Sequence, residues 1–378
     1  MPGEVYITRL SKYLPNDPVS NEEMEDFLGK INGKTSRAKN LVLRNNQIRN
    51  RYYAMDKNGN STHTNAELTA EAIKRLVGDD FQLEEIDLLA CGTTSPDQLL
   101  PSHSAMVHGE LKINPVEIVS MSGACCTGMQ AMKFGYLSVL AGQAKNAVCT
   151  GSEKLSSWES AKNFQLEAES WKRMEQEPIL AFEKDFLRWM LSDGAGAALL
   201  QDKPSGDMSL RIEWIESISY ANKIGTCMYA GGDLMNNGEL KGWKEFEPEQ
   251  LTKQSVFSLR QDVKLLGENI VKLGTDFYVD LINDNKFSPS EIDFFLPHLS
   301  SEYFRQKIAD EISSRGVNIP QEKWYTNLTK LGNVGAASIY FMLEELFHSG
   351  ELKKGNKILL MIPESARFSY VYSLLTVV

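Results

Sequence analysis

The chain carries a weak internal duplication, and this feature constrains its fold more than any other. Residues 85–95 read EIDLLACGTTS, and residues 291–301, which begin 206 positions later, read EIDFFLPHLSS. Each segment has the pattern of a turn or helix end, then a short buried strand, then a polar loop. The same local arrangement is therefore predicted twice along the chain.

The repeat continues through a helix and a further strand. Residues 127–141 and 335–347 both have apolar residues at helical spacing, and a glycine-led loop follows each of them. Buried strands are then predicted at 147–153 in the first copy and at 357–365 in the second. Strands that alternate with helices predict an α/β architecture. A duplicated unit would place two sheets about a pseudo-twofold axis, with their loops meeting near that axis.

This duplication divides the chain into a first half, residues 1–205, and a second half, residues 206–378. Residues 156–190 have no counterpart in the second half. They are rich in Trp, Glu, Lys and Phe, and we predict a mainly helical insertion that packs as a lid or a dimer flange. Residues 193–198 (DGAGAA) are not a dinucleotide-binding loop, because they lack a third glycine and lead into an apolar strand.

Composition excludes several classes of function. The net charge is −10, so nucleic acid and anionic membrane surfaces would repel the chain. No apolar run reaches the roughly 18–20 residues that span a bilayer, and the N-terminus lacks the features of a secretory signal. The five cysteines are odd in number and two are adjacent, which favours a reducing compartment over a disulfide framework. We expect a cytoplasmic protein without membrane insertion, nucleic-acid partner or metal site.

Cys126 is the candidate nucleophile. It lies within residues 122–128 (SGACCTG), where the first predicted helix begins. Unpaired backbone N–H groups and the helix dipole at that position favour a thiolate over a thiol. Taken alone, a cysteine in this place is more often a small buried apolar residue.

Asn333 and His298 stand at matching places in the second half. Asn333 opens the second predicted helix, where alone it would be read as a helix cap. His298 follows the strand that corresponds to residues 86–91, where alone it would be read as a structural histidine. Under the duplication both should converge on Cys126. The set suits thioester chemistry, because the thiolate can take an acyl group while the two N–H groups stabilise the enolate of a second thioester.

These residues resemble the β-ketoacyl-ACP synthase III group of the thiolase superfamily over nearly the whole chain. The segments that carry the resemblance are TTSPD (93–97), ACCTG (124–128), GSE (151–153), DGAGA (193–197), PH (297–298) and GNVGAAS (332–338). The resemblance implies a five-layered αβαβα thiolase fold, a homodimer, no cofactor, and substrates held as thioesters on acyl carrier protein or CoA. It also implies that Cys126, which stands directly before an x-Gly pair, carries the acyl group. His298 and Asn333 would then activate the second substrate, and Cys125 would match a neighbour that is usually small.

The loop after residue 364 departs from the primer-forming members of that group. Those members carry a glycine triplet there, and its backbone helps to form the oxyanion hole. This chain instead has Ser365, Ala366, Arg367 and Phe368, which places side chains where backbone approached the substrate. We therefore predict these four residues to contact substrate. Arg367 would contact a carboxylate or a pantetheine phosphate, or else form a structural ion pair.

Leu100 separates the chain from another set of relatives. In head-to-head hydrocarbon-forming enzymes a glutamate occupies this position, whereas a leucine suits the lining of an acyl tunnel. Together with residues 297–301 (PHLSS) and the insertion, these departures resemble ketosynthases that make dialkylresorcinols and cyclohexanediones. Such enzymes join a β-ketoacyl thioester to a second, often α,β-unsaturated, acyl thioester by Michael addition and Claisen condensation.

Three alternatives stay open. The first is a synthase that condenses acyl-CoA with malonyl-ACP to start fatty-acid synthesis. The second is an acyltransferase that passes the acyl group to oxygen or nitrogen, and the third is a non-catalytic subunit of a heterodimer. The presence of a cysteine, a histidine and an asparagine together disfavours the last two, because neither simple transfer nor an inert subunit needs groups that stabilise an enolate.

Overall fold

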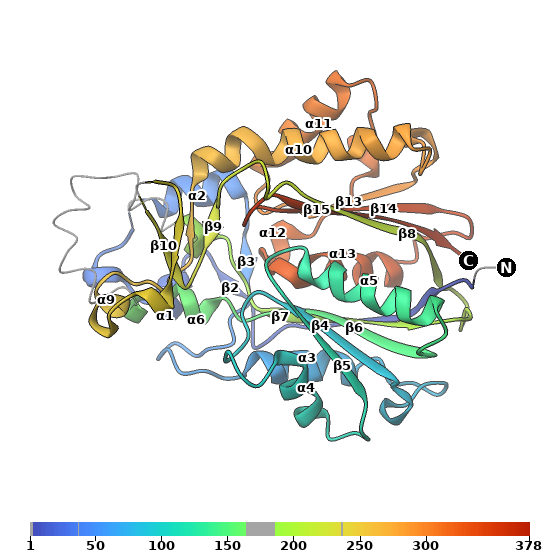
Figure 1. Cartoon of the computed structure of the whole chain (residues 1–378), viewed down its shortest axis with the longest axis horizontal. Coiled ribbons are helices and arrows are strands. Elements are labelled where there is room, and N and C mark those ends of the chain that lie inside the picture. Colours follow the sequence, from blue (N-terminus) through green and yellow to red (C-terminus); the bar gives the residue numbers. More distant parts are fainter. Residues whose placement is uncertain (1–2, 37, 164–185, 236) are drawn as a thin grey trace.

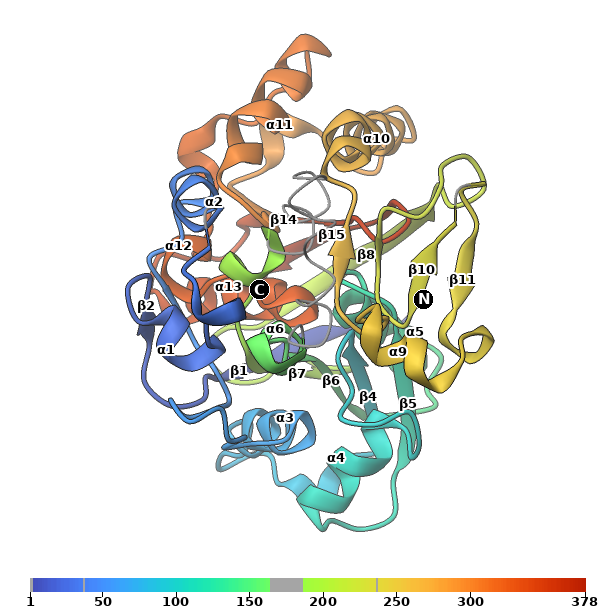
Figure 2. The ribbon, with the colours of Figure 1, turned by 90° about the vertical axis from the view of Figure 1, so that its left-hand side faces the viewer.

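Five alternating layers of helices and strands make up the molecule (Figure 1). The computed structural model describes residues 3–36, 38–163, 186–235 and 237–378. One outer layer holds α10 (Val263–Asn283) and α11 (Tyr303–Ser314), and the other holds α3 (Asn65–Lys74) and α4 (His103–Leu111). Strands lie beneath each outer layer, and α5 (Thr127–Leu140) and α13 (Ser338–His348) lie between the two groups of strands. The quarter-turn view of Figure 2 shows the same sequence of layers, which confirms the predicted five-layered α/β fold.

Nine strands form one mixed sheet in the order β13-β14-β15-β8-β1-β7-β6-β4-β5. Their bounds are β1 (Tyr6–Tyr13), β4 (Leu88–Thr93), β5 (Glu117–Ser122), β6 (Asn146–Glu153), β7 (Gly194–Gln201), β8 (Leu210–Ser219), β13 (Phe294–Pro297), β14 (Lys357–Glu364) and β15 (Ser369–Val377). Two residue pairs join β1 to β8. The sheet therefore consists of two groups of strands, one on each side of α5 and α13.

The two groups repeat one pattern. In the first, β4 pairs in parallel with β5 and β6, and β6, β7 and β1 then follow in antiparallel order. In the second, β13 pairs in parallel with β14, and β14, β15 and β8 follow in antiparallel order. A parallel bridge between Phe295 and Trp324 stands where the first group has β5. The strand order thus repeats along the chain, while the division at residues 205 and 206, between β7 and β8, stays a prediction.

Glycines allow the two halves to approach closely at the centre. A Cβ atom added to Gly128, in the first turn of α5, would lie 2.2 Å from the carbonyl oxygen of Ala336. A Cβ atom added to Gly151 in β6 would lie equally close to the same oxygen. Ala336 belongs to η9 (Gly335–Ala337), the 3-10 turn that leads into α13. These contacts place the starts of α5 and α13 beside each other.

Capping residues fix the outer helices. Thr64 and Glu67 form a capping box at the start of α3, which satisfies two backbone N–H groups that the helix itself leaves unpaired. The side chain of Asp262 accepts a hydrogen bond from the N–H of Leu265 at the start of α10. Both helices bury one face on the strands, as their amphipathic spacing predicts.

The remaining elements are short. The helices are α1 (Met24–Leu28), α2 (Lys39–Asn46), α6 (Ser156–Glu159), α9 (Pro248–Lys253) and α12 (Leu328–Leu331), with 3-10 turns η1 (Ile31–Gly33), η2 (Leu83–Glu85), η3 (Ala161–Asn163), η5 (Leu187–Trp189), η6 (Trp243–Glu245), η7 (Pro289–Glu291) and η8 (Gln321–Lys323). The strands are β2 (Val19–Ser20), β3 (Asn50–Arg51), β9 (Met228–Tyr229), β10 (Gly232–Leu234), β11 (Leu240–Gly242) and β12 (Arg260–Gln261). They pair as β2 with β3, β9 with β12 and β10 with β11.

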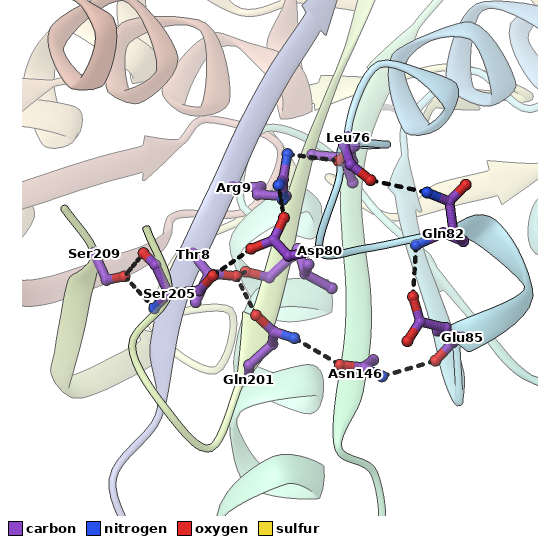
Figure 3. Close-up of polar contacts among 12 residues, drawn as sticks. Thr8, Arg9, Leu76, Asp80, Gln82, Glu85, Asn146, Gln201, Ser205 and Ser209 are labelled. Atoms are coloured by element: carbon purple, nitrogen blue, oxygen red, sulfur yellow. Dashed lines mark hydrogen bonds and ion pairs between the residues drawn. The ribbon is translucent and has the colours of Figure 1, made fainter. Parts of the chain in front are cut away.

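A polar network ties together the strand ends on the opposite side of the molecule (Figure 3). Gln201 at the end of β7 donates to Asn146 at the start of β6 over 2.8 Å and accepts from Thr8 of β1 over 2.7 Å. Arg9 pairs with Asp80, which also accepts a hydrogen bond from Ser205 over 2.5 Å. This end is held by ordinary polar contacts, whereas the other end of the same strands carries the candidate site.

The predicted insertion is only partly within the described chain. Residues 164–185 lie outside it, so the prediction of a helix there is untested. The flanks form α6, η3 and η5, and Trp189 is fully buried. Among the described residues, no helix combines the length and apolar character that a membrane crossing requires.

Candidate active site

The carboxyl ends of the parallel strands meet at one end of the molecule. β6 ends at Glu153, β14 ends at Glu364, and His298 directly follows β13. The chain leaving β5 reaches Cys125 and Cys126 before α5 begins. Strand ends of this kind are the usual location of active sites in α/β sheets, and the duplication brings two sets of them together.

Two pockets meet at this place, and Cys125 lines both. The first lies against α10 and α11 and is lined by Cys125, Leu266, Ile270, Val271, His298, Leu299, Ser300, Phe304, Ile308, Met361, Pro363 and Ser365. The second is lined by Thr94, Ala124, Cys125, Leu155, Leu187, Leu191, Met228, Leu259, Gln261, Ser300, Asn333, Gly335 and Ser365. Apart from Cys125, the two pockets share Ser300 and Ser365. His298 belongs to the first pocket and Asn333 to the second.

Cys126, the predicted nucleophile, lines neither pocket. Its side chain is 0% exposed and packs in the central core with Met129 and Met132. The Cys126 thiol donates to the carbonyl oxygen of Ile362 over 3.3 Å. Residues three apart at a helix start share a face, so Cys126 follows Met129 and Met132 into the core. Cys126 therefore lies behind the pockets, directly after Cys125, and its role as the nucleophile stays a prediction.

His298 presents an unpaired ring nitrogen in the first pocket. The side chain is 3% exposed, and its Nε2 has no hydrogen-bond partner among the described residues. Its backbone is fixed by a hydrogen bond from its N–H to the carbonyl oxygen of Met361 over 2.8 Å. Burial lowers the pKa of His298 to about 4, because a charged imidazolium is poorly solvated there. The ring is therefore neutral near pH 7, and Nε2 remains available to a ligand.

Asn333 is held by three hydrogen bonds at the start of η9. Its backbone N–H donates to Met190 and its carbonyl oxygen accepts from Ser192, both over 2.9 Å. The side-chain Oδ1 accepts from the N–H of Gly335 over 3.0 Å. Since the acceptor end of the amide is engaged, the Nδ2 donor is left for the second pocket. The residues at the end of the insertion thus support Asn333.

Two buried glutamates hold the helix starts, and each comes from the other half of the chain. Glu153 accepts from the N–H of Ala336 over 3.1 Å, just before α13. Glu364 accepts from the N–H groups of Ala124 and Cys126 over 3.2 and 3.1 Å, just before α5. Burial raises the pKa of both carboxyl groups. Helix starts favour such anions, since their N–H groups are otherwise unpaired.

The surroundings of both cysteines disfavour a thiolate. Burial raises the pKa of the Cys126 thiol first, and the nearby Glu364 carboxylate raises it further. Burial and then the carboxylates of Glu364 and Glu153 raise the pKa of the Cys125 thiol in the same direction. The expected lowering of a cysteine pKa at a helix start is therefore opposed here, because Glu364 already occupies the N–H groups of that start.

The chain is similar to known proteins over most of its length. The profile of the family 3-oxoacyl-[acyl-carrier-protein] synthase III, C-terminal, matches residues 282–362. β-Ketoacyl-[acyl-carrier-protein] synthase III of Clostridium perfringens is 26% identical over 353 residues, which are 92% of each chain. The chain is a β-ketoacyl-ACP synthase III-like acyltransferase. The profile contains His298 and Asn333 but ends before Ser365.

Solved structures show the fold of this acyltransferase. OleA of Xanthomonas campestris superimposes with a TM-score of 0.76 at 19% identity, covering 100% of this chain and 99% of the other. The tetronic acid condensing enzyme AbyA1 superimposes with a TM-score of 0.74 at 18% identity, covering 98% and 99%. The acyltransferase therefore has the thiolase fold of condensing enzymes, which the sequence resemblance had implied.

The predicted substrate loop contributes one residue to the pockets of the acyltransferase. Ser365 lines both pockets. Ala366 uses its carbonyl oxygen to accept from the N–H groups of Cys227 and Met228, and Phe368 is fully buried with φ at 57°. Arg367 is exposed. The loop turns at these three residues, and none of them lines either pocket. Ala366 binds the backbone of Met228, which lines the second pocket.

Leu100 also lies outside the pockets of its own chain. Its side chain is 85% exposed on the loop between β4 and α4. The predicted contact with an acyl tunnel is therefore not made within a single copy of the chain.

Sequence reasoning missed two polar residues of the pockets. Ser300 lines both of them, and Gln261 lines the second. Ser300 stands two residues after His298, so the predicted loop at the strand end could have indicated it. Gln261 comes from β12, whose position depends on pairing with β9, and no local pattern reveals that pairing.

Proposed function

We propose that the acyltransferase carries an acyl group on Cys126 and forms a carbon–carbon bond between it and a second acyl thioester. In the first step the Cys126 sulfur attacks the carbonyl carbon of an acyl thioester on acyl carrier protein or CoA. The carrier leaves as a free thiol that takes the proton of Cys126, so the thioester bond is exchanged without any cofactor. The observation that supports this step is that Cys126 stands at the start of α5, directly after Cys125, which lies where both pockets meet.

His298 and Asn333 are proposed to activate the second thioester. The neutral His298 ring has an unpaired Nε2, and the Nδ2 group of Asn333 is free because Gly335 engages Oδ1. Hydrogen bonds from both groups to the thioester oxygen would stabilise the enolate that attacks the acyl group. The new carbon–carbon bond forms as the bond to Cys126 breaks, and the proton lost from the α-carbon of the second thioester ends on the departing sulfur, which regenerates the thiol.

The finer proposal is a cyclising condensation of two chains. Both pockets are lined mainly by apolar side chains, with Leu266, Ile270 and Ile308 in the first and Leu155, Leu187 and Leu191 in the second. The two apolar pockets meet at Cys125, next to Cys126, and such a pair of pockets suits two acyl chains. A β-ketoacyl thioester would add to a second, α,β-unsaturated, chain by Michael addition, and Claisen condensation would close a cyclohexanedione or dialkylresorcinol precursor.

The second candidate is the first step of fatty-acid synthesis, the condensation of acyl-CoA with malonyl-ACP. The relatives named β-ketoacyl-[acyl-carrier-protein] synthase III, aligned over 92% of this chain, favour it. Purified enzyme given acetyl-CoA and malonyl-ACP distinguishes the two. Rapid formation of acetoacetyl-ACP supports initiation, whereas reaction only with longer β-ketoacyl and unsaturated thioesters supports cyclisation.

Acyl loading tests the nucleophile directly, and the adjacent cysteines form a matched pair. Wild-type enzyme, Cys125→Ala and Cys126→Ala are each incubated with a panel of acyl-CoA and acyl-ACP thioesters and weighed by intact-protein mass spectrometry. We expect acyl adducts on the wild type and on Cys125→Ala but not on Cys126→Ala. Loss of loading in Cys125→Ala alone would assign the nucleophile to Cys125, the thiol that lines both pockets. Peptide mapping of the adduct then locates the modified sulfur.

We further propose a cytoplasmic homodimer. β5 is an edge strand of the nine-stranded sheet, and Glu117, Ile118 and Ser120 on it are exposed. An edge strand with open hydrogen-bonding groups readily pairs with another strand, and the exposed Leu99 and Leu100 lie on the loop after neighbouring β4. Light scattering on the purified chain should give twice the monomer mass, and Ile118→Lys should reduce it. A monomeric wild type would overturn this proposal.

A further inference from the structure

Glu364 has a carboxyl oxygen without a hydrogen bond next to the proposed nucleophile. Its Oε2 accepts from the backbone N–H groups of Ala124 and Cys126 over 3.2 and 3.1 Å. Across the described residues its Oε1 makes no hydrogen bond, although each oxygen of an ionised carboxyl group can accept. The side chain is 9% exposed. One oxygen of Glu364 therefore holds the start of α5, and the other is left for a further partner.

The Cys126 thiol lies at the same strand end as Glu364. It donates to the carbonyl oxygen of Ile362 over 3.3 Å, two residues before Glu364 on β14. It also contacts the carbonyl oxygen of Ser369 over 3.7 Å, and Ser369 is the residue of β15 that pairs with Glu364. The Glu364 charge also acts on this thiol, because it helps to raise the thiol pKa. A thioester that reaches the Cys126 sulfur therefore comes close to the Glu364 carboxyl group as well.

A condensation of two acyl thioesters needs a base unless one of them loses carbon dioxide. The α-carbon of the second thioester must give up a proton before it attacks the acyl group on Cys126. That carbon stands roughly 3–3.5 Å from the acyl carbonyl carbon as the bond forms, so the base must lie near the Cys126 sulfur. His298 and Asn333 do not supply it, because the proposed function uses both as hydrogen-bond donors to the thioester oxygen.

Two carboxyl groups lie near the cysteines, and their oxygens are engaged differently. The charges of Glu364 and Glu153 both raise the pKa of Cys125. In Glu153, Oε1 accepts from the N–H of Ala336 over 3.1 Å, and Oε2 accepts from the Ser95 hydroxyl over 2.6 Å. Glu364 instead keeps Oε1 open, and burial raises the pKa of its carboxyl group. A raised pKa makes a carboxylate a stronger base.

We infer that Glu364 is the catalytic base of a condensation that does not begin with loss of carbon dioxide. The inference rests on the proposed acylation of Cys126. The Glu364 carboxylate takes the α-proton of the second thioester, and the electron pair of that C–H bond becomes the enolate. The enolate forms the new carbon–carbon bond as the thioester bond to Cys126 breaks. Glu364 then gives the proton to the departing sulfur, so the carboxylate and the thiol both return to their starting states.

The same carboxylate disfavours a malonyl donor. A malonyl thioester carries a carboxylate of its own, which the Glu364 charge repels at close range. Loss of carbon dioxide also produces the enolate without removal of a proton, so this donor does not need a base. We therefore expect the two classes of donor to respond differently when the Glu364 charge is removed.

The test follows condensation after loading. Wild-type enzyme and Glu364→Gln are loaded with octanoyl-CoA and then given either 3-oxooctanoyl-CoA or malonyl-CoA. Intact-protein mass spectrometry measures loading, which also shows that the variant is folded, and chromatography measures the product. We expect Glu364→Gln to load at least as fast as the wild type and to condense 3-oxooctanoyl-CoA about 100-fold or more slowly. Its condensation with malonyl-CoA should be unchanged or faster.

Replacement of the carboxylate gives a second measurement. In Glu364→Ala, added formate can enter the space that the side chain leaves. We expect formate to raise condensation with 3-oxooctanoyl-CoA about tenfold or more without changing loading. Glu351→Gln, which changes an exposed glutamate after α13, is the matched control and should behave as the wild type in both steps.

Three results would overturn the inference and leave the proposed function standing. One is condensation of 3-oxooctanoyl-CoA by Glu364→Gln within about threefold of the wild-type rate. Another is loss of condensation with every donor that the wild type accepts, without recovery in formate, which would limit Glu364 to supporting α5. The third is a wild type that loads Cys126 but condenses malonyl-CoA alone. If no chain loads on Cys126 of the wild type, the proposed acylation fails, and the inference about Glu364 fails with it.

Discussion

Glu364 accepts a hydrogen bond from the backbone N–H of Cys126 over 3.1 Å, and this contact places a buried carboxyl group near the thiol of the same residue. Burial and then the Glu364 charge raise the pKa of the Cys126 thiol. In Glu364→Gln the amide oxygen can still accept from Cys126, but the negative charge is gone. We expect acylation of Cys126 at pH 7 to rise about threefold to tenfold.

The pH profile of acylation separates this charge effect from a structural one. The profile of Glu364→Gln should shift toward lower pH relative to that of the wild type, because the thiolate forms more readily. Glu364→Asp keeps the charge and serves as the comparison. Identical profiles for the wild type and Glu364→Gln would show that the Glu364 charge does not act on Cys126.

Acyl loading and condensation should depend on different residues. In His298→Ala and Asn333→Ala we expect loading of Cys126 within about threefold of wild type, because neither side chain is needed for thioester exchange. Condensation should fall at least about 100-fold, since each variant lacks one donor to the developing enolate. Mass spectrometry measures the first step and chromatographic product analysis the second. Equal losses in both steps would assign these residues to loading instead.

Buried histidine makes folding sensitive to acid. The pKa of His298 is lowered to about 4 in the folded chain, against roughly 6.5 when unfolded. Below pH 6.5 the unfolded state binds a proton that the folded state does not, so stability is lost as the pH falls from 6.5 toward 4. The wild type should lose about 2 kcal/mol more stability than His298→Gln between pH 7 and pH 5. Urea unfolding at the two pH values measures this difference.

His103 also contributes to the loss of stability in acid, both in the wild type and in His298→Gln. Burial lowers its pKa to about 4 as well, so His298→Gln should remain partly acid-sensitive. A wild type and a His298→Gln variant that lose equal stability between the two pH values would contradict the burial of a neutral His298.

The contact between the halves should be intolerant of a single methyl group. Gly128→Ala places a Cβ atom 2.2 Å from the Ala336 carbonyl oxygen, and both groups belong to rigid backbone. We expect destabilisation of about 3 kcal/mol or more, measured by urea unfolding. Gly267→Ala in α10 is the matched control, because nothing lies within 4 Å of its added Cβ. That change should stabilise the helix by about 0.5–1 kcal/mol.

The fold was predictable because its evidence is local. The strand patterns at residues 88–93 and 294–297 and the helical patterns after residues 126 and 337 are visible in short windows. Their repetition then predicted the layers, and the rule that parallel strand ends converge predicted the region of the site. His298 lies there because it directly follows such an end.

The choice between Cys125 and Cys126 cannot be made from the local sequence pattern alone. Neighbouring residues at a helix start differ by about 100° in direction, so the side chain that faces the pocket depends on the residue at which α5 begins. The glycine two residues after Cys126 led us to predict that member of the pair, and the loading experiment decides between the two. In the structure that glycine, Gly128, serves the contact with Ala336. Gln261 was out of reach for a different reason, because its place depends on the pairing of two short strands far from the repeat.

Glu153 and Glu364 give the duplication a practical consequence. The carboxyl group of each half accepts hydrogen bonds from the helix start of the other half. Neither half therefore holds the carboxyl group that supports its own helix start. A fragment that holds one copy would lack more than a partner for its active-site residues, because the turn that presents them would also lose its support. A single copy can obtain that support from a second molecule of itself, and joining two copies in one gene makes the exchange permanent.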